Sequence, residues 1–142
     1  MNGKKNLSFK CHKIAGGSGG GKALISSDPV CFYQAEPKTG IMIENNHALK
    51  GQNIANRVLI FPSGKGSSAV QGEGLHQLTK NGTAPKALII QHPDTVLVAG
   101  AVIWKIPLVD QVEEEFYKHV ENDAYVKVDA DKGVITLIKG GS

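Results

Sequence analysis

Residues 58–82 read VLIFPSGKGSSAVQGEGLHQLTKNG, an apolar run followed by a glycine-rich turn and a helix-forming stretch. The opening run, VLIF, is continuously apolar, as in a strand that is buried on both faces. Three apolar side chains fall near one face of the helix that follows: Val70, Leu75 and Leu78. Asn81-Gly82 is a helix stop signal, and a second apolar run occupies residues 87–90. The segment therefore predicts a strand–helix–strand crossover in an α/β fold.

The rest of the chain predicts a β-rich first part, with further strand and helix units after it. Strands are expected at residues 9–14, 23–25, 30–33, 41–43 and 106–109, with a terminal hairpin over 124–138. The glycine-rich residues 16–21 are expected to form a loop that joins two strands of one sheet. Residues 94–104 predict a helix capped by Asp94, or else a buried strand, and residues 112–120 a helical turn or two. No repeat or boundary is visible, so residues 1–142 are expected to form a single domain.

The composition is ordinary for a soluble globular domain, and it argues against several classes of function. The formal net charge is only +3 and the lysines are scattered, so no nucleic-acid interface is predicted. The apolar run of residues 95–104 is about half the length needed to cross a bilayer, and the basic N-terminus lacks an apolar signal segment. Cys11 and Cys31 are far apart in the sequence, which predicts reduced thiols in a cytoplasmic protein.

The glycine-rich turn and the two serines after it are the best candidate for a ligand site. Their spacing matches neither a Walker motif nor a dinucleotide-binding fingerprint. What remains is a helix N-terminus with free N–H groups, Lys65 and several hydroxyls, which suits a carboxylate or a phosphate. The alternative is that Ser67 serves only as the N-cap of the helix. The residue types alone leave both interpretations open.

No second site can be read from the remaining polar residues. The five histidines have no spacing typical of metal ligands: His12, His47, His76, His92 and His119. The acidic run at residues 113–115 predicts a solvated helix face, and Asp129 and Asp131 are explained by the turn of a hairpin. The residues alone therefore predict an anion site on a strand–loop–helix unit.

Several motifs of the chain occur, in the same order, in the swivel-domain small subunit of the aconitase X family. They are PKTG at 37–40, LKGQ at 49–52, RVL at 57–59, PSGKGSS at 62–68, NGTAP at 81–85 and PD at 93–94, with VD at 128–129 and Gly133 near the end. The chain resembles this subunit over nearly its whole length. The resemblance implies a swivelling β/β/α domain like that of aconitase.

The resemblance also implies a hydro-lyase (a dehydratase) that is active only with a large aconitase-like subunit, as a heterodimer. Ser67 then matches the serine that acts as the base and takes a proton from carbon. Four neighbouring residues are expected to bind the small anionic substrate: Gly64, Lys65, Gly66 and Ser68. The large subunit is expected to carry a 4Fe–4S iron–sulfur cluster, whose iron acts as a Lewis acid on the leaving hydroxyl. Neither a cofactor nor a metal site is expected in this chain.

Two substrates are consistent with the resemblance. The favoured one is 5-phosphomevalonate, dehydrated to trans-anhydromevalonate 5-phosphate in the archaeal mevalonate pathway of isoprenoid biosynthesis. The alternative is cis-3-hydroxy-L-proline, and a non-catalytic anion-binding domain is a third hypothesis. The chain departs from the family pattern at residues 34–36 (QAE) and 69–71 (AVQ). An altered substrate is a hypothesis for both departures. For residues 34–36, an altered contact with the large subunit is a second hypothesis.

Overall fold

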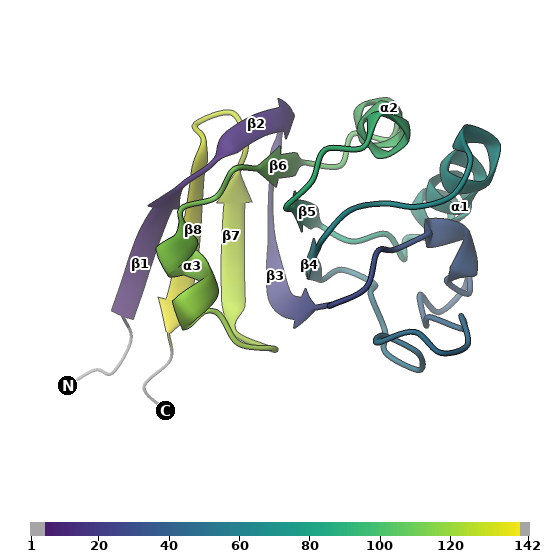
Figure 1. Ribbon diagram of the computed structural model, residues 1–142, viewed down its shortest axis with the longest axis horizontal. Coiled ribbons are helices and arrows are strands. Elements are labelled where there is room, and N and C mark those ends of the chain that lie inside the picture. Colours follow the sequence, from purple (N-terminus) through teal and green to yellow (C-terminus); the bar gives the residue numbers. More distant parts are fainter. Residues whose placement is uncertain (1–4, 140–142) are drawn as a thin grey trace.

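The computed structural model describes residues 5–139 (Figure 1). Eight strands, three α-helices and one 3-10 helix follow each other along these residues: β1 Lys5–Lys10, β2 His12–Ala15, β3 Ser18–Ile25, η1 Phe32–Gln34, β4 Val58–Phe61, α1 Ser68–Lys80, β5 Ala87–Ile90, α2 Thr95–Ile103, β6 Leu108–Asp110, α3 Glu114–His119, β7 Tyr125–Asp129 and β8 Val134–Lys139. None of the helices in this part of the chain is long and apolar enough to span a membrane.

All eight strands belong to one mixed sheet, in the order β1-β8-β7-β3-β4-β5-β6-β2. The strand β3 joins its two halves, because its first residues pair antiparallel with β7 and its last residues pair parallel with β4. Strands β3, β4, β5 and β6 are parallel, and the remaining pairs are antiparallel. Only Cys11 separates β1 from β2, although the two lie at opposite edges of the sheet. The sheet therefore curls back on itself, with β1 and β2 as one ribbon between the edges (Figure 1).

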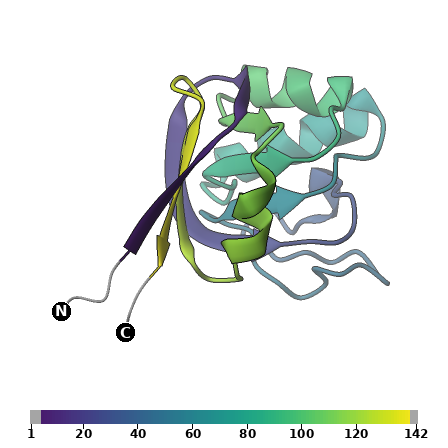
Figure 2. The same ribbon diagram turned by 60° about the vertical axis from the view of Figure 1, so that its left-hand side comes forward.

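The central strands are buried on both faces, because a different layer covers each face. On β4, Leu59 and Phe61 join a core with the helices α1 and α2, whereas Val58 and Ile60 join a core with α3. The strand β5 alternates in the same way. Figures 1 and 2 show α1 and α2 together on one side of the sheet and α3 on the other. This double burial is the reason why the sequence of β4 is continuously apolar rather than alternating.

The predicted crossover, the helix that begins after Asp94 and the terminal hairpin are all confirmed. The prediction of a loop at residues 16–21 is wrong, since β3 already begins at Ser18. The glycines of this strand pack against backbone: a Cβ at Gly19 would overlap the carbonyl oxygen of Lys86, and one at Gly21 would lie 2.5 Å from that of Asn56. The glycine run is therefore explained by close approach of other segments and not by flexibility.

Three strand predictions also need correction. The strand expected at residues 9–14 is divided at Cys11 into β1 and β2, which pair with different partners. Residues 30–33 form an isolated bridge at Val30 and the start of η1, and residues 41–43 take part only in isolated bridges. In these two segments, contacts with α1 and with neighbouring loops override the local strand preference.

Gly74 supplies a test of the packing between α1 and η1. A Cβ at Gly74 would overlap the backbone of Tyr33 and Phe32, whereas a Cβ at Gly72 would meet nothing within 4 Å. We expect Gly74→Ala to lower the free energy of unfolding by about 2 kcal/mol through overpacking. Gly72→Ala is the matched control and should raise it by roughly 0.5–1 kcal/mol through helix propensity. Urea denaturation measures both, and equal stabilities for the two variants would contradict this packing.

The thiol of Cys11 supplies a test of the junction between β1 and β2. Partial burial, with the charges of Asp110 and Asp129 nearby, raises its pKa from 9.0 to about 11. Because the thiolate is the reactive form, we expect alkylation of Cys11 at pH 8 to be about 100-fold slower in the folded chain than in urea. The rate in the folded chain should then rise up to about pH 11. Mass spectrometry of the Cys11 peptide measures both rates, and equal rates would rule out this environment.

Candidate functional site

The glycine-rich loop, residues 62–67, leaves the carboxyl end of β4 and leads into α1. Its backbone is held on two sides. The amides of Gln91 and His92 donate to the carbonyl oxygen of Pro62, at 3.0 and 2.9 Å. On the other side, Val30 donates to the carbonyl oxygen of Ser63 and accepts from the amide of Lys65. The loop is thus fixed at the edge of the parallel strands where ligands of α/β proteins commonly bind.

Ser67 is the N-cap of α1, with an extended backbone. Its Oγ accepts a hydrogen bond from the amide of Val70, at 3.3 Å, and the residue is exposed to solvent. The capping role that the sequence left open is therefore confirmed. That role does not exclude chemistry, because the cap uses one lone pair of the hydroxyl and leaves its O–H free to donate elsewhere.

The two glycines of the loop are required by its geometry. Gly66 has a φ of +102°, which favours glycine, and a Cβ there would lie 3.2 Å from the Sγ of Cys31. A Cβ at Gly64 would lie 2.8 Å from both Asp94 Oδ2 and Gln71 Nε2. The absence of side chains therefore lets the loop pack closely on α1, α2 and the segment before η1.

Lys65 forms an ion pair that the sequence did not predict. Its Nζ donates to Oε2 of Glu44, at 2.5 Å. Glu44 comes from the segment between the turn at residues 37–40 and β4, 21 residues before the lysine. No local pattern connects the two positions, so this partner could be found only from the fold.

Gln71 is a second residue whose role the sequence did not predict. Its side chain is completely buried, with 0% exposure. The Oε1 accepts from the amide of Phe32 at 2.6 Å, and the Nε2 donates to the carbonyl oxygen of Val30 at 3.1 Å. Gln71 therefore ties the segment around η1 to the first turn of α1.

The histidines form no cluster at the loop, although the amide of His92 bonds to Pro62. His47 is buried and uses both ring nitrogens locally, with Nε2 at 2.7 Å from Pro29 O and Nδ1 accepting from Leu49 N. His12 bonds to Asp110, and His76 stacks on Trp104. Within residues 5–139, no three His, Cys, Asp or Glu side chains lie close enough together to hold a metal ion.

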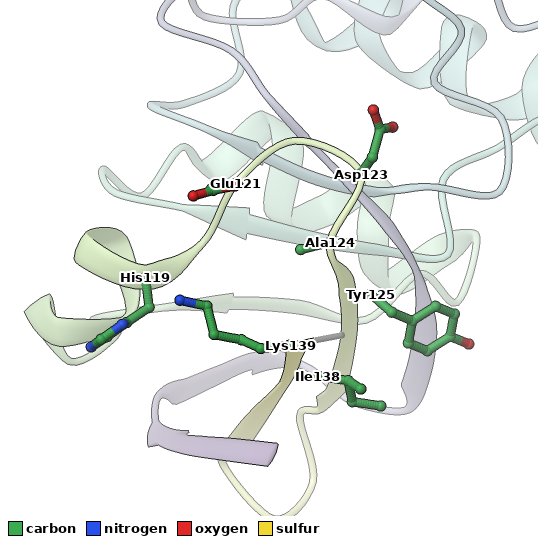
Figure 3. A pocket seen from close by; sticks show the side chains of 7 residues that line it. All are labelled: His119, Glu121, Asp123, Ala124, Tyr125, Ile138 and Lys139. Atoms are coloured by element: carbon green, nitrogen blue, oxygen red, sulfur yellow. The ribbon is translucent and has the colours of Figure 1, made fainter. Parts of the chain in front are cut away.

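A surface pocket of about 560 Å³ lies beside the end of α3 and the hairpin β7–β8. Figure 3 shows that its side chains come from the end of α3, the loop after it and the hairpin β7–β8. Its lining mixes His119 and Lys139 with Glu121 and Asp123. The glycine-rich loop does not contribute to it, so this pocket is separate from the candidate site.

Comparison with known proteins gives relatives over nearly the whole chain. The model of the aconitase X swivel domain matches residues 8–137. The phosphomevalonate dehydratase small subunit of Methanosarcina acetivorans is 41% identical over 134 residues, which are 94% of this chain and 92% of that protein. Its counterpart from Thermococcus kodakarensis is 36% identical and covers 95% of this chain and 99% of its own length.

A solved structure agrees with these relatives. The crystal structure of Thermococcus kodakaraensis aconitase X in its holo-form superposes with a TM-score of 0.83, at 36% identity, over 94% of this chain and 99% of that chain. The predicted resemblance and the predicted swivel fold are both confirmed. The chain belongs to the aconitase X swivel-domain family.

Proposed function

We propose that this chain is the small subunit of a cytoplasmic, two-subunit hydro-lyase that converts 5-phosphomevalonate to trans-anhydromevalonate 5-phosphate and water. The observation that carries the proposal is the similarity, over more than nine-tenths of the chain, to proteins named phosphomevalonate dehydratase small subunits. The loop that ends in an exposed Ser67 at a helix N-terminus supports it, because such a loop can bind an anion and present a hydroxyl to it.

Ser67 is the proton acceptor in this proposal. Dehydration breaks a C–H bond and a C–O bond on adjacent carbons, forms the C=C bond, and releases the hydroxyl with a proton as water. An ordinary serine is a weak base, so an alkoxide at Ser67 Oγ needs donors and positive charge around it. The free N–H groups at the start of α1 supply donors, since the first amides of a helix have no intrahelical acceptor. Lys65, two residues earlier, carries the cation of the loop, and its charge is shared with the carboxylate of Glu44.

The loop also provides the groups that would bind the substrate. The amides of Gly66 and Ser68 lie next to Ser67, and the side chain of Lys65 is 41% exposed. The amide of Lys65 already donates to Val30, so the residue would bind a ligand through its ammonium, which also pairs with Glu44. In this proposal Gly64 acts indirectly, since its close packing on Asp94 and Gln71 fixes the loop.

The large subunit is proposed to carry the 4Fe–4S cluster. The two cysteines of this chain do not form a donor set, because Cys11 lies between β1 and β2 whereas Cys31 contacts the loop after β4. When bound to the partner, the cluster would supply a Lewis acid for the departing hydroxyl. This chain would then supply the base and the anion-binding groups of a shared site.

The large subunit is further proposed to cover the loop through an apolar rim. The rim consists of Tyr33, Ile43 and Val70, with exposures of 55%, 54% and 36%. These residues lie on segments that contact each other: Ile43 donates to Gln34 O, and Val70 lies near Gly66 in the first turn of α1. An apolar rim around a polar loop is typical of a protein contact that excludes water from a site.

Ser67→Ala and Ser67→Asn together test the role of the serine. Both remove the hydroxyl, so we expect each to lower kcat of the reconstituted two-subunit enzyme at least about 10³-fold with 5-phosphomevalonate. Asparagine is an equally good N-cap, so Ser67→Asn should keep the stability that Ser67→Ala loses, about 1 kcal/mol. Substantial turnover by either variant would refute the assignment. Turnover of cis-3-hydroxy-L-proline in place of 5-phosphomevalonate would correct the substrate but not the base.

Ile43→Asp tests the apolar rim. A charge buried in a desolvated protein contact is costly, so we expect the affinity for the large subunit to fall about 10-fold or more. Val102→Asp is the matched control, because Val102 is similarly exposed at 57% but lies near the end of α2 that is remote from the loop. Surface plasmon resonance on the large subunit measures both. Equal affinities for the two variants would place the contact elsewhere.

A further inference from the structure

Glu44 is the acidic partner of the lysine in the glycine-rich loop. Its Oε2 accepts from Lys65 Nζ at 2.5 Å. The two side chains differ in environment: that of Glu44 is 22% exposed, and that of Lys65 is 41% exposed. The carboxylate is thus the more buried member of the pair, whereas the lysine side chain is the more exposed one.

The backbone next to Glu44 is held from both sides. The amide of Met42 donates to Gln52 O, and the amide of Ile43 donates to Gln34 O, each at 2.9 Å. Isolated bridges join Met42 to Ala35 and Ile41 to Asn53. The backbone that carries the Glu44 side chain is therefore fixed by hydrogen bonds. The backbone of Lys65 is fixed as well, through its amide bond to Val30.

The second oxygen of Glu44 indicates that the pair costs stability. Oε1 is buried and has no hydrogen-bond partner within the described residues. A desolvated carboxylate oxygen without a donor is unfavourable, and an ion pair with a half-exposed lysine recovers little. Stability alone therefore does not explain why a carboxylate stands at this position.

We propose that Glu44 is a positioning residue, which holds the Lys65 ammonium in place for the anionic group of the substrate. This inference rests on the proposed function. A free lysine side chain samples many rotamers, and ordering it on binding would cost affinity. The fixed carboxylate orders it in advance, while the exposed side of the ammonium remains available to a phosphate or carboxylate oxygen.

A double-mutant cycle on the reconstituted two-subunit enzyme tests this role. We expect Glu44→Ala to raise KM for 5-phosphomevalonate about 10-fold, with kcat within about 3-fold of wild type. Lys65→Met should raise KM at least as much, and the double variant should equal Lys65→Met alone. Glu44→Gln should recover part of the loss, because its amide oxygen still accepts from the ammonium. Glu115→Ala, which removes the carboxylate of an exposed pair on α3, should leave KM unchanged.

The thermal midpoint separates positioning from a structural role. We expect the Tm of Glu44→Ala to stay within about 2 °C of wild type or to rise, since a buried unpaired oxygen is removed. A Tm lowered by more than about 5 °C together with an unchanged KM would show a structural role and overturn the proposal. Additive losses of affinity in the double variant would overturn it as well.

Calorimetric measurement of Kd for 5-phosphomevalonate, on the same complexes, distinguishes this proposal from the proposed function. If the wild-type complex binds the compound without dehydrating it, the reaction is wrong, and the cycle in Kd still decides the role of Glu44. If the complex turns the compound over and Glu44→Ala has wild-type KM, only the positioning role is overturned. If the wild-type complex neither binds nor dehydrates it, both are overturned.

Discussion

The carboxamide of Gln71 is the contact on which the candidate site depends. It is fully buried in the first turns of α1, and it satisfies the amide of Phe32 and the carbonyl oxygen of Val30. A buried amide left without an acceptor costs roughly 1–3 kcal/mol. Loss of the Gln71 side chain would therefore destabilise the segment around η1. Val30 also pairs with the glycine-rich loop. Its amide donates to Ser63 O, and its carbonyl oxygen accepts from the amide of Lys65. One buried side chain thereby links α1, the segment before η1 and the loop into a single unit.

That unit explains why structural and chemical roles fall on the same residues. Gly64 and Gly66 allow the loop to pack on Asp94, Gln71 and Cys31, and this packing directs the loop toward Ser67. Ser67 caps the helix with one lone pair and keeps its hydroxyl exposed. The groups that would bind an anion are therefore held before any ligand arrives, which lowers the cost of ordering them on binding.

The sequence predicted the parts of the molecule that local chemistry controls. The apolar run of β4, the stop at Asn81 and the terminal hairpin all follow from short-range patterns, and all are present. The cap at Ser67 was one of two interpretations that the sequence left open. It did not predict that the glycines of β3 lie in a strand, because the reason is the close approach of Lys86 and Asn56, which are distant in the chain. Glu44 and Gln71 were missed for the same reason: their partners are 21 and about 40 residues away.

The closure of the sheet has a consequence for how the protein is made. The first strand pairs with the last, with Lys5 opposite Lys139, and β2 and β3 pair with β6 and β7. During synthesis, the opening strands leave the ribosome before any of these partners exists. A topology dominated by such distant pairings has high contact order and folds slowly, because long loops must close before the contacts that stabilise them can form. The nascent chain must therefore remain without its native edges until β8 has emerged.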